Sequence, residues 1–455
     1  MNRTTKVLLA IGGIIVLSYP GIAWVTGAVI ESRMQHNEQQ ALDQVPYLTL
    51  VKREYHRGVY RSTETATYGF HVPLPLGQNA AAALLSAATV TIVHNIQHGP
   101  FPGLHTAALA VVDSTLVTPP ALQKELAAAL GSKPLLGAHT IVGLFGGATT
   151  ELTSPALSLV LPDGSTLAWE GLTGTFRSTR NLAGWTGQLS VPRFVIQGAQ
   201  GMIQLAGLEY SGSSQRAFEG LYLGTGTLTV ERLGASDASA EHGFSLQRLS
   251  LTTVSKAHGE FFDMRADAAL DAAKFAAVQL KNVTYSESVE HLHGPTFASM
   301  TQAIRSAEQQ AGSNPAQLQA GLQDAVRQYG ANLLLQDPVL DIRQVGFAMP
   351  EGSFLFSAKV SAPGLSQADL QSPAAAIGAL RTHAEITADL RVDNGLVQKL
   401  LTMGGSNPKI ATQLTSLEQQ GYLTAGSGAV TTHLEYSAGR LTLNGHAFPP
   451  ASPAN

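Results

Sequence analysis

The chain has 455 residues, and its 28 basic and 32 acidic side chains give a formal net charge of −4 at pH 7. Charged residues make up 13 % of the sequence, about half of the share usual in soluble domains, while the hydrophobic share of 44 % is sufficient for a core. This balance gives no electrostatic basis for binding nucleic acid. The absence of cysteine excludes disulfides, thiolate metal sites and a lipidated N-terminal cysteine. A chain of this length predicts two or three domains.

The first predicted element is an uncharged run, residues 7–30, which follows the basic residues Arg3 and Lys6. As a helix, its 24 residues would extend roughly 36 Å, enough to cross a hydrocarbon core of about 30 Å. The positive charges before the run predict that residues 1–6 are a cytoplasmic tip and that 7–30 is a transmembrane anchor. The remainder of the chain is then expected on the other side of the membrane.

A cleaved signal peptide is the alternative interpretation of the same run, with small residues at 21–23 or 26–28 as cleavage sites. We favour a retained anchor because apolar residues continue past Pro20. The run also exceeds the usual signal-peptide core of about 7–15 residues.

Residues 31–294 are predicted to form a β-rich region after a helical extension, Ser32–Leu42, that ends before Pro46. Alternating residues predict a strand on each side of Gly58. Ala80–Ala88 and Ala121–Leu130 are predicted to be short helices. Regular strand spacing favours an antiparallel sheet or sandwich. Further strands are expected at Ala156–Leu161, Ser165–Glu170, Thr173–Arg177, Trp185–Val191, Phe194–Gln197, Met202–Tyr210, Thr227–Val230, Phe244–Leu251, Glu260–Leu270 and Ala276–Ser286.

Residues 295–446 are predicted to be an α+β region that contains a duplication, followed by a loose tail, 447–455. A helix at 296–311 restarts at Asn314-Pro315, and strands follow at 339–345 and 353–360. The order recurs as a helix at 392–403, a restart at Asn407-Pro408, and strands at 429–436 and 440–443. The two Gly-Ser-Asn-Pro tetrapeptides are 93 residues apart, which makes a repeated helix–helix–strand–strand unit plausible. The helix stripes expected to pack on the strands are Leu318, Leu322 and Val326, and Ile410, Leu414 and Leu417.

The histidines were weighed as metal ligands. One group is His94, His98 and His105. The other is Glu290, His291 and His293, in which the two histidines would share one face of a strand. Neither group has a complete ligand set in the sequence, so we predict no metal site and no cofactor. The glycine-rich stretch 220–230 leads into a strand rather than a helix, so it does not fit a nucleotide-binding loop.

Three short motifs carry a family resemblance. They are Tyr55-His-Arg-Gly-Val-Tyr-Arg-Ser62, Gln97-His-Gly-Pro-Phe101 and Gly439-Arg-Leu-Thr-Leu-Asn-Gly445. With the N-terminal run, they resemble the YdgA-like family of bacterial envelope proteins, whose molecular function is unassigned. The resemblance implies a single-pass inner-membrane protein with a large periplasmic part, and it supplies no catalytic residues.

A non-catalytic binding or scaffolding role in the cell envelope is the function we expect, with no catalytic residue assigned. The sequence contains no serine-hydrolase elbow, zinc-protease helix, phosphate loop or cysteine nucleophile. Partners would be the membrane, through the N-terminal helix, and a lipid or an envelope protein. Lipid handling, by architectural analogy with AsmA-like proteins, is one alternative and predicts a continuous apolar groove. A periplasmic hydrolase without a recognisable motif is another and predicts a small polar pocket with shifted pKa values. The oligomeric state stays open.

Overall fold

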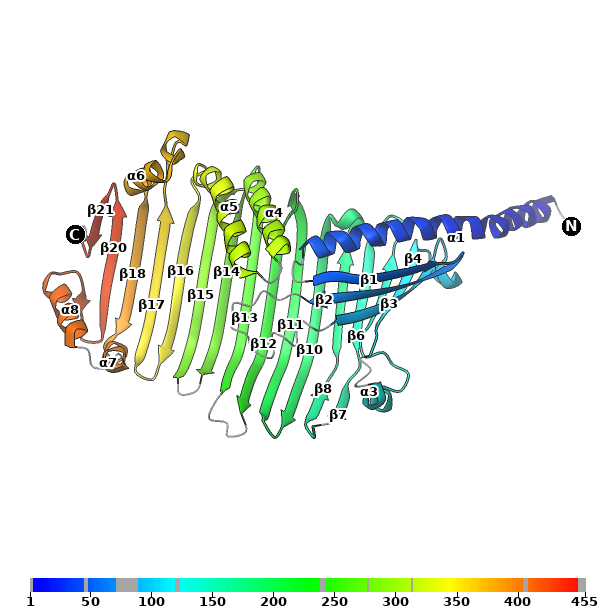
Figure 1. The fold of residues 1–455 in the computed structure, drawn as a ribbon, viewed down its shortest axis with the longest axis horizontal. Coiled ribbons are helices and arrows are strands. Elements are labelled where there is room, and N and C mark those ends of the chain that lie inside the picture. Colours follow the sequence, from blue (N-terminus) through cyan, green and yellow to red (C-terminus); the bar gives the residue numbers. More distant parts are fainter. Residues whose placement is uncertain are drawn as a thin grey trace. The chain divides into compact units, whose positions relative to one another are not determined.

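The computed structural model of the chain describes residues 3–44, 48–70, 89–118, 123–161, 163–237, 243–275, 278–311, 314–403 and 408–448. The chain forms two compact units (Figure 1). Unit 1 is Met1–Leu161, Thr166–Pro192 and Thr301–Asp324, and unit 2 is Pro162–Ser165, Arg193–Met300 and Ala325–Asn455. The predicted β-rich α+β class is confirmed. The predicted helix Ala80–Ala88 and the tail from residue 449 lie outside the described residues.

The sheet of unit 1 is antiparallel and mostly follows chain order. Strands β1 to β6 pair with their neighbours in turn, β6 then pairs with β9, and β9 pairs with β10. A hairpin joins β7 to β8, and β8 also pairs with β10. The predicted helix before Leu130 is α3, Gln123–Leu130. The strands are β1 Leu48–Arg57, β2 Arg61–Phe70, β3 Thr89–His98, β4 Ala110–Leu116, β5 Gly137–Val142, β6 Ala148–Ser154, β7 Leu157–Val160, β8 Thr166–Trp169, β9 Leu172–Ser178 and β10 Gly184–Gly198.

One expected break in this sheet is wrong. The strands predicted at 185–191 and 194–197 form the single strand β10, which runs through Pro192. Proline lacks the N–H that a central ladder needs. The pairing of β10 with β9 ends at Ser190, two residues before the proline.

The long helix α1, Arg3–Gln44, packs along β3 of this sheet. Ala23 and Ile30 are fully buried, and Ile30 belongs to a core cluster with Ile96, Ala110 and Val112. The predicted helical extension to residue 42 is therefore confirmed. Among the described residues, no helix is long and apolar enough to span a membrane. The side chains of residues 3–18 lie outside the described part of the chain, so the anchor at 7–30 stays a prediction.

The sheet of unit 2 is an antiparallel meander from β11 to β18, in which each strand pairs with the next. One edge of β20 pairs with β18, and β19 and β21 both pair with β20, with β22 beyond β21. The strands are β11 Gly201–Phe218, β12 Leu221–Asp237, β13 Gly243–His258, β14 Phe261–Phe275, β15 Val278–His293, β16 Val339–Met349, β17 Gly352–Ser361, β18 Glu385–Asp393, β19 Thr424–Ala425, β20 Ala429–Ser437, β21 Arg440–Leu443 and β22 His446–Ala447.

Helices interrupt this meander at the ends of strands. Helices α4 (Gly294–Ala311) and α5 (Pro315–Leu334) connect β15 to β16, and their residues Thr301–Asp324 belong to unit 1. Helix α6 (Pro373–His383) connects β17 to β18. Helices α7 (Asn394–Met403) and α8 (Pro408–Gln419) follow β18. We expected a domain boundary at residue 295. Strand β15, which ends just before this residue, pairs with β16, which follows the two helices.

The predicted repeat is matched in element order, but not in every residue. Asn314 caps α5 as predicted, because its side-chain oxygen accepts the backbone N–H groups of Ala316 and Gln317. Helix α6 and strand β18 lie between the two predicted units and were not expected. Val326 is 59 % exposed, and the buried position of that stripe is the neighbouring Ala325. The side chain of Ile410 lies outside the described residues, and a common origin of the two units stays a prediction.

Candidate functional site

An uninterrupted apolar stripe crosses the sheet of unit 2. Residues that stand opposite each other in neighbouring strands share a face, so the strand register identifies the stripe directly. It has one residue from each of eight strands, β11 to β18, in the order Tyr210, Leu228, Leu251, Ala268, Tyr285, Val345, Phe356 and Leu390. Seven inter-strand spacings of about 4.8 Å give it a length of roughly 34 Å.

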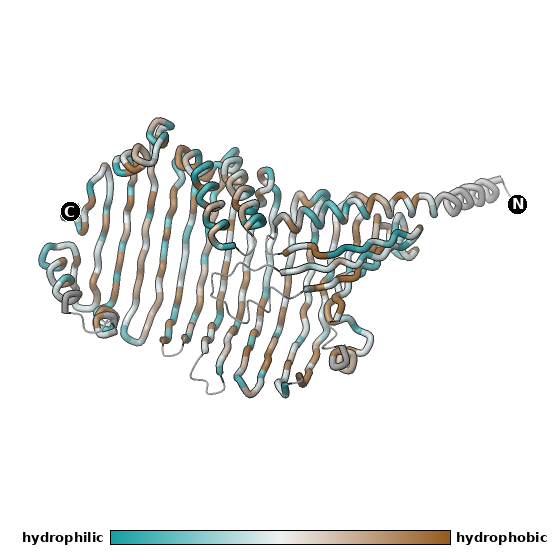
Figure 2. Tube along the Cα trace, in the orientation of Figure 1, coloured by the Kyte–Doolittle hydropathy of each residue, from teal (hydrophilic) through white to brown (hydrophobic). Residues whose placement is uncertain are grey.

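Parallel rows widen the apolar stripe into an apolar face. The row beside it toward one end is Leu208, Val230, Leu249, Leu270 and Val283. A row on the other side, in the later strands, is Val289, Leu340, Val360, Ile386, Tyr436 and Leu441. Figure 2 shows the resulting alternation of hydrophobic and hydrophilic residues along the long strands.

The opposite face of the same sheet is polar. The row adjacent to the stripe is Ser211, Thr227, Thr252, Asp267, Ser286 and Gln344. Further along this face, His433 contacts Asp389 at 2.7 Å beside a hollow of about 460 Å³. Both side chains are about half exposed, as is usual for ion pairs on a solvated surface. The sheet is therefore amphipathic across its thickness.

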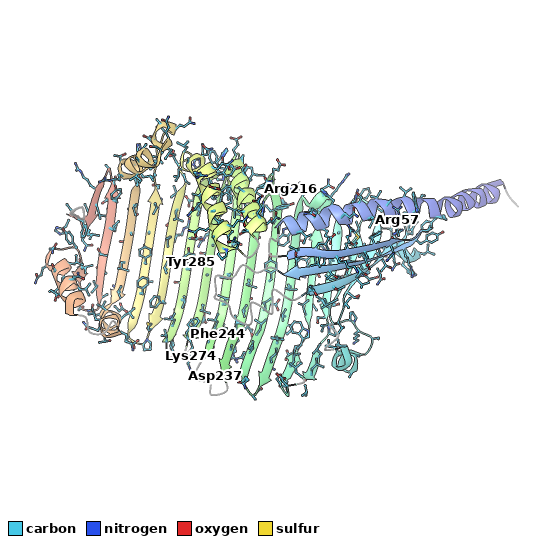
Figure 3. All side chains as sticks on the ribbon, in the orientation of Figure 1. Arg57, Arg216, Asp237, Phe244, Lys274 and Tyr285 are labelled. Carbon is cyan, nitrogen blue, oxygen red and sulfur yellow. The ribbon has the colours of Figure 1, made fainter. Side chains whose placement is uncertain are left out.

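The apolar face is open over its middle and covered at one end. Leu251 and Tyr285 of the stripe are 37 % and 38 % exposed, and Figure 3 shows Tyr285 on the open sheet. At the end where α4 begins, Phe297 meets the ring of Phe262 edge-on at 5.3 Å. Phe262 is buried with Leu223 and Leu292 in a second core cluster. An apolar sheet face that is only partly covered is a marker of a binding surface.

The predicted histidine groups have ordinary hydrogen-bond partners. His98 is buried, its Nδ1 donating to the carbonyl of Val59 and its Nε2 accepting from Ser62, both at 2.9 Å. His105 is exposed. His291 and His293 both flank the ring of Phe261, and the Nδ1 of His291 bonds the Gln336 carbonyl at 2.6 Å. Over the described residues, no group of three or more potential ligands gathers to hold a metal ion.

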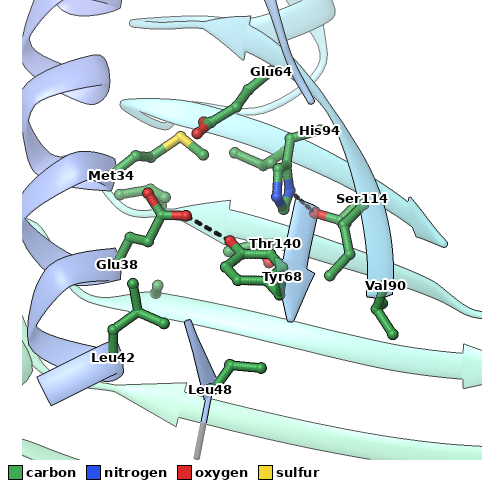
Figure 4. A pocket seen from close by; sticks show the side chains of 14 residues that line it. Met34, Glu38, Leu42, Leu48, Glu64, Tyr68, Val90, His94, Ser114 and Thr140 are labelled. Carbon is green, nitrogen blue, oxygen red and sulfur yellow. Dashed lines mark hydrogen bonds between the residues drawn. The ribbon is translucent and has the colours of Figure 1, made fainter. Parts of the chain in front are cut away.

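A second hollow lies in unit 1, between α1 and the sheet. It has a volume of about 540 Å³, within the range of small-molecule sites, and Figure 4 shows its lining. The walls are mainly aliphatic, with Met34 and Leu42 from α1 opposite Val90, Ile92 and Val112 of the sheet. Sequence reasoning missed it because its two walls are separated in the chain and no single segment carries its pattern.

A buried charged cluster stands at the edge of the unit 1 cavity. Arg53 forms an ion pair with Glu64, which is 2 % exposed, and its Nε lies 3.7 Å from Glu38 of α1. Tyr68 donates to Glu38 at 2.6 Å, and burial together with that carboxylate raises the pKa of the Tyr68 hydroxyl. The cluster ties α1 to the sheet. One signal was present in the sequence, since Glu64 alternates with Ser62 and Ala66 at inward positions of β2.

The most enzyme-like pair in unit 1 is His94 and Ser114, whose Nδ1 and Oγ are 2.7 Å apart. Burial lowers the pKa of His94, which keeps its imidazole neutral and able to accept a proton at neutral pH. However, Ser114 stands in the middle of β4, paired with His94 on one side and Ala138 on the other. Its strand position does not offer the converging N–H donors of an oxyanion hole. The carboxylate nearest in register, Glu64, is engaged by Arg53.

Comparison with known proteins finds relatives without an assigned activity. Residues 1–451 match the family model described as "Bacterial protein of unknown function (DUF945)". The protein YdgA of Escherichia coli (strain K12) is 22 % identical over 485 residues, which cover 97 % of this chain and 94 % of YdgA. No solved structure matches this chain. The resemblance to YdgA-like proteins seen in the short motifs is confirmed over the whole length.

Proposed function

We propose that this chain, which belongs to the DUF945 family of bacterial proteins of unknown function, binds lipid acyl chains. In this proposal it is anchored in the membrane and is not catalytic. Residues 7–30 would anchor it in the inner membrane, and the bulk would be periplasmic. The apolar face of unit 2 would receive the chains.

The observation that carries this proposal is the apolar stripe of eight strands. Acyl chains have no polar group along their length, so they are recognised by apolar area rather than by hydrogen bonds. A face of aliphatic and aromatic side chains, with Tyr285 and Leu251 more than a third exposed, offers that area. Each Å² of apolar surface removed from water stabilises the complex by about 25 cal/mol. A membrane anchor would keep this face close to a supply of lipid.

The acyl-chain proposal is tested by photo-crosslinking in cells that produce the full chain. Benzoylphenylalanine replaces Tyr285 on the apolar stripe, and in a matched strain it replaces Glu209, an exposed residue on the polar face next to Tyr210. After irradiation, mass spectrometry of the purified protein identifies the adducts. We expect lipid adducts at position 285 and none at 209.

The other outcomes overturn the lipid proposal in distinct ways. Protein adducts at 285 without lipid would favour a scaffold, and equal lipid adducts at both positions would show non-specific contact with membrane. Membrane topology is tested separately with C-terminal reporters on the full chain. Active alkaline phosphatase is expected, and a C-terminus that reports only from the cytoplasm would contradict the anchor orientation.

A further inference from the structure

Two sheet connections in unit 1 gather around the point where α1 leaves the sheet. The β1–β2 turn contains Tyr60, whose ring stacks on Tyr19 of α1 at 5.8 Å. The β3–β4 loop contains Phe101, whose carbonyl accepts the Tyr19 hydroxyl at 2.8 Å. In the antiparallel sheet both connections stand at the same end, and α1 continues past this end toward the N-terminus (Figure 1).

The tips of these connections expose large apolar side chains. Leu104, in the β3–β4 loop, is 79 % exposed, and Phe101, Val59 and Tyr60 are each nearly half exposed. Neither loop uses these side chains to close a core. A soluble surface normally carries such residues singly, whereas here they stand on two loops that both contact Tyr19 of α1.

The outer face of α1 continues the same apolar surface. Ile22, Trp24, Val25 and Val29 are exposed there, on the side away from buried Ala23 and Ile30. The exposed positions become polar at Ser32 and Arg33. The change from apolar to polar therefore occurs partway along the stretch that packs on the sheet.

Aromatic and cationic groups meet at the border of this surface. The guanidinium of Arg57 lies over the Trp24 ring, 4.9 Å from its centre, and also pairs with Glu31 at 3.3 Å. Tryptophan and tyrosine concentrate at the level of lipid headgroups because their rings are amphipathic. Arginine extends from an apolar stem toward phosphates at the same level.

We infer that the β1–β2 turn, the β3–β4 loop and the outer face of α1 form an apolar collar that inserts into the bilayer around the anchor. The collar is Ile22, Trp24, Val25, Val29, Val59, Tyr60, Phe101 and Leu104. This rests on the proposed anchoring, and adds to it a monotopic contact of unit 1 with lipid. The occupant is the bilayer because α1 continues from Tyr19, which both loops contact, into the uncharged run 7–18.

The absence of native cysteine makes a depth measurement direct. The full chain is reconstituted in vesicles of phosphatidylethanolamine and phosphatidylglycerol, with one cysteine per variant carrying a polarity-sensitive fluorophore. The collar variants are Leu104→Cys and Val59→Cys, and the anchor variant is Ile11→Cys. The matched control is Val117→Cys, an exposed valine at the far end of β4 from the loop.

Quenching by lipids spin-labelled along the acyl chain reports contact with the bilayer. We expect blue-shifted, quenched fluorescence at 104 and 59 that approaches the signal at 11, and water-exposed fluorescence at 117. If position 11 is quenched while 59 or 104 behaves like 117, the collar is overturned and the anchor stands. If position 11 is also unquenched, both the anchor and the collar fail. Quenching at 117 equal to that at 104 would also overturn the collar, since it would mean that unit 1 contacts lipid indiscriminately.

Discussion

Gly27 is the residue that allows α1 to approach the sheet of unit 1. A Cβ at this position would lie 2.4 Å from Cε1 of His98. The His98 ring cannot move aside cheaply, because it is buried and both of its nitrogens are hydrogen-bonded. Gly27→Ala should therefore lower the stability of the full chain by about 1–3 kcal/mol, as overpacked cores do.

A second glycine of the same helix is the control for Gly27. At Gly21 a Cβ would have nothing within 4 Å, so Gly21→Ala should be neutral or should stabilise the helix by up to about 1 kcal/mol. Thermal unfolding of both variants in the same detergent makes the comparison. Equal melting temperatures for the two variants would mean that the close approach at His98 does not stabilise the fold.

His94 should make the stability of the chain depend on pH. Burial lowers its pKa, and Arg53 lowers it further, while Glu64 and Glu38 oppose the shift. The unfolded chain then binds a proton at His94 below a pH of about 6.5, where the folded chain does not, so unfolding becomes easier as the pH falls. Between about pH 7.5 and 5.5, the melting temperature of the His94→Gln variant should therefore fall less than that of the wild type. An equal loss in both proteins would place the acid sensitivity elsewhere.

The cavity residues show why the sequence predicted no site. His94, Ser114 and Glu64 come from three strands, and Glu38 comes from a helix that was predicted only as an extension of an anchor. No segment by itself shows that these four side chains meet. The site arises from strand register and from the position of α1, and neither is encoded in a local pattern.

At the scale of elements, the strands named from the sequence are present but their lengths were predicted poorly, and β4, β5, β6 and β18 were not named. In β13 the expected strand Phe244–Leu251 is in fact Gly243–His258. Regular alternation fails inside it, because Leu246 and Leu249 are both half-buried while Gln247 and Arg248 between them are exposed. Arg248 has φ of 51°, and Gly207 and Asn282 at matching places in β11 and β15 also have positive φ. This row of backbone bends changes the phase of the alternation, which a period of two does not anticipate.

Helix α5 offers a test of the corrected stripe. Ala325 is 2 % exposed and Val326 is 59 % exposed, although the spacing of leucines had favoured Val326 as the buried residue. Ala325→Asp should cost about 3 kcal/mol or more, because it leaves a charge buried without a partner. Val326→Asp should change stability by no more than about 0.5 kcal/mol, as surface substitutions do. Denaturant unfolding measures the free energy of unfolding of both variants. A larger loss of this free energy for Val326→Asp would support the stripe predicted from the sequence.

At the scale of the whole molecule, the proposed anchor, the proposed collar and the apolar face of unit 2 have one chemistry in common. Residues 7–30 carry no charge, the collar exposes aliphatic and aromatic side chains, and the unit 2 stripe is apolar in all eight strands. The low share of charged residues, 13 %, is consistent with a chain that keeps much apolar surface near lipid. Composition could signal this surplus. Composition could not show where this apolar surface lies, because an amphipathic strand has the same sequence pattern whether its apolar side is covered or open.

The acyl-chain proposal makes a final prediction about charge on the open face. Leu251→Lys places an ammonium in the middle of the stripe, where an occupying chain would have to displace its water at a cost of about 1–3 kcal/mol. Lipid that remains with the full chain after mild detergent extraction, measured by mass spectrometry per mole of protein, should fall roughly tenfold. The matched control is Thr252→Lys, the next residue on the polar face, where the new charge stands opposite Asp267. The two variants differ only in the face of the sheet that carries the new lysine. If both retain lipid equally, the lipid is bound elsewhere on the protein.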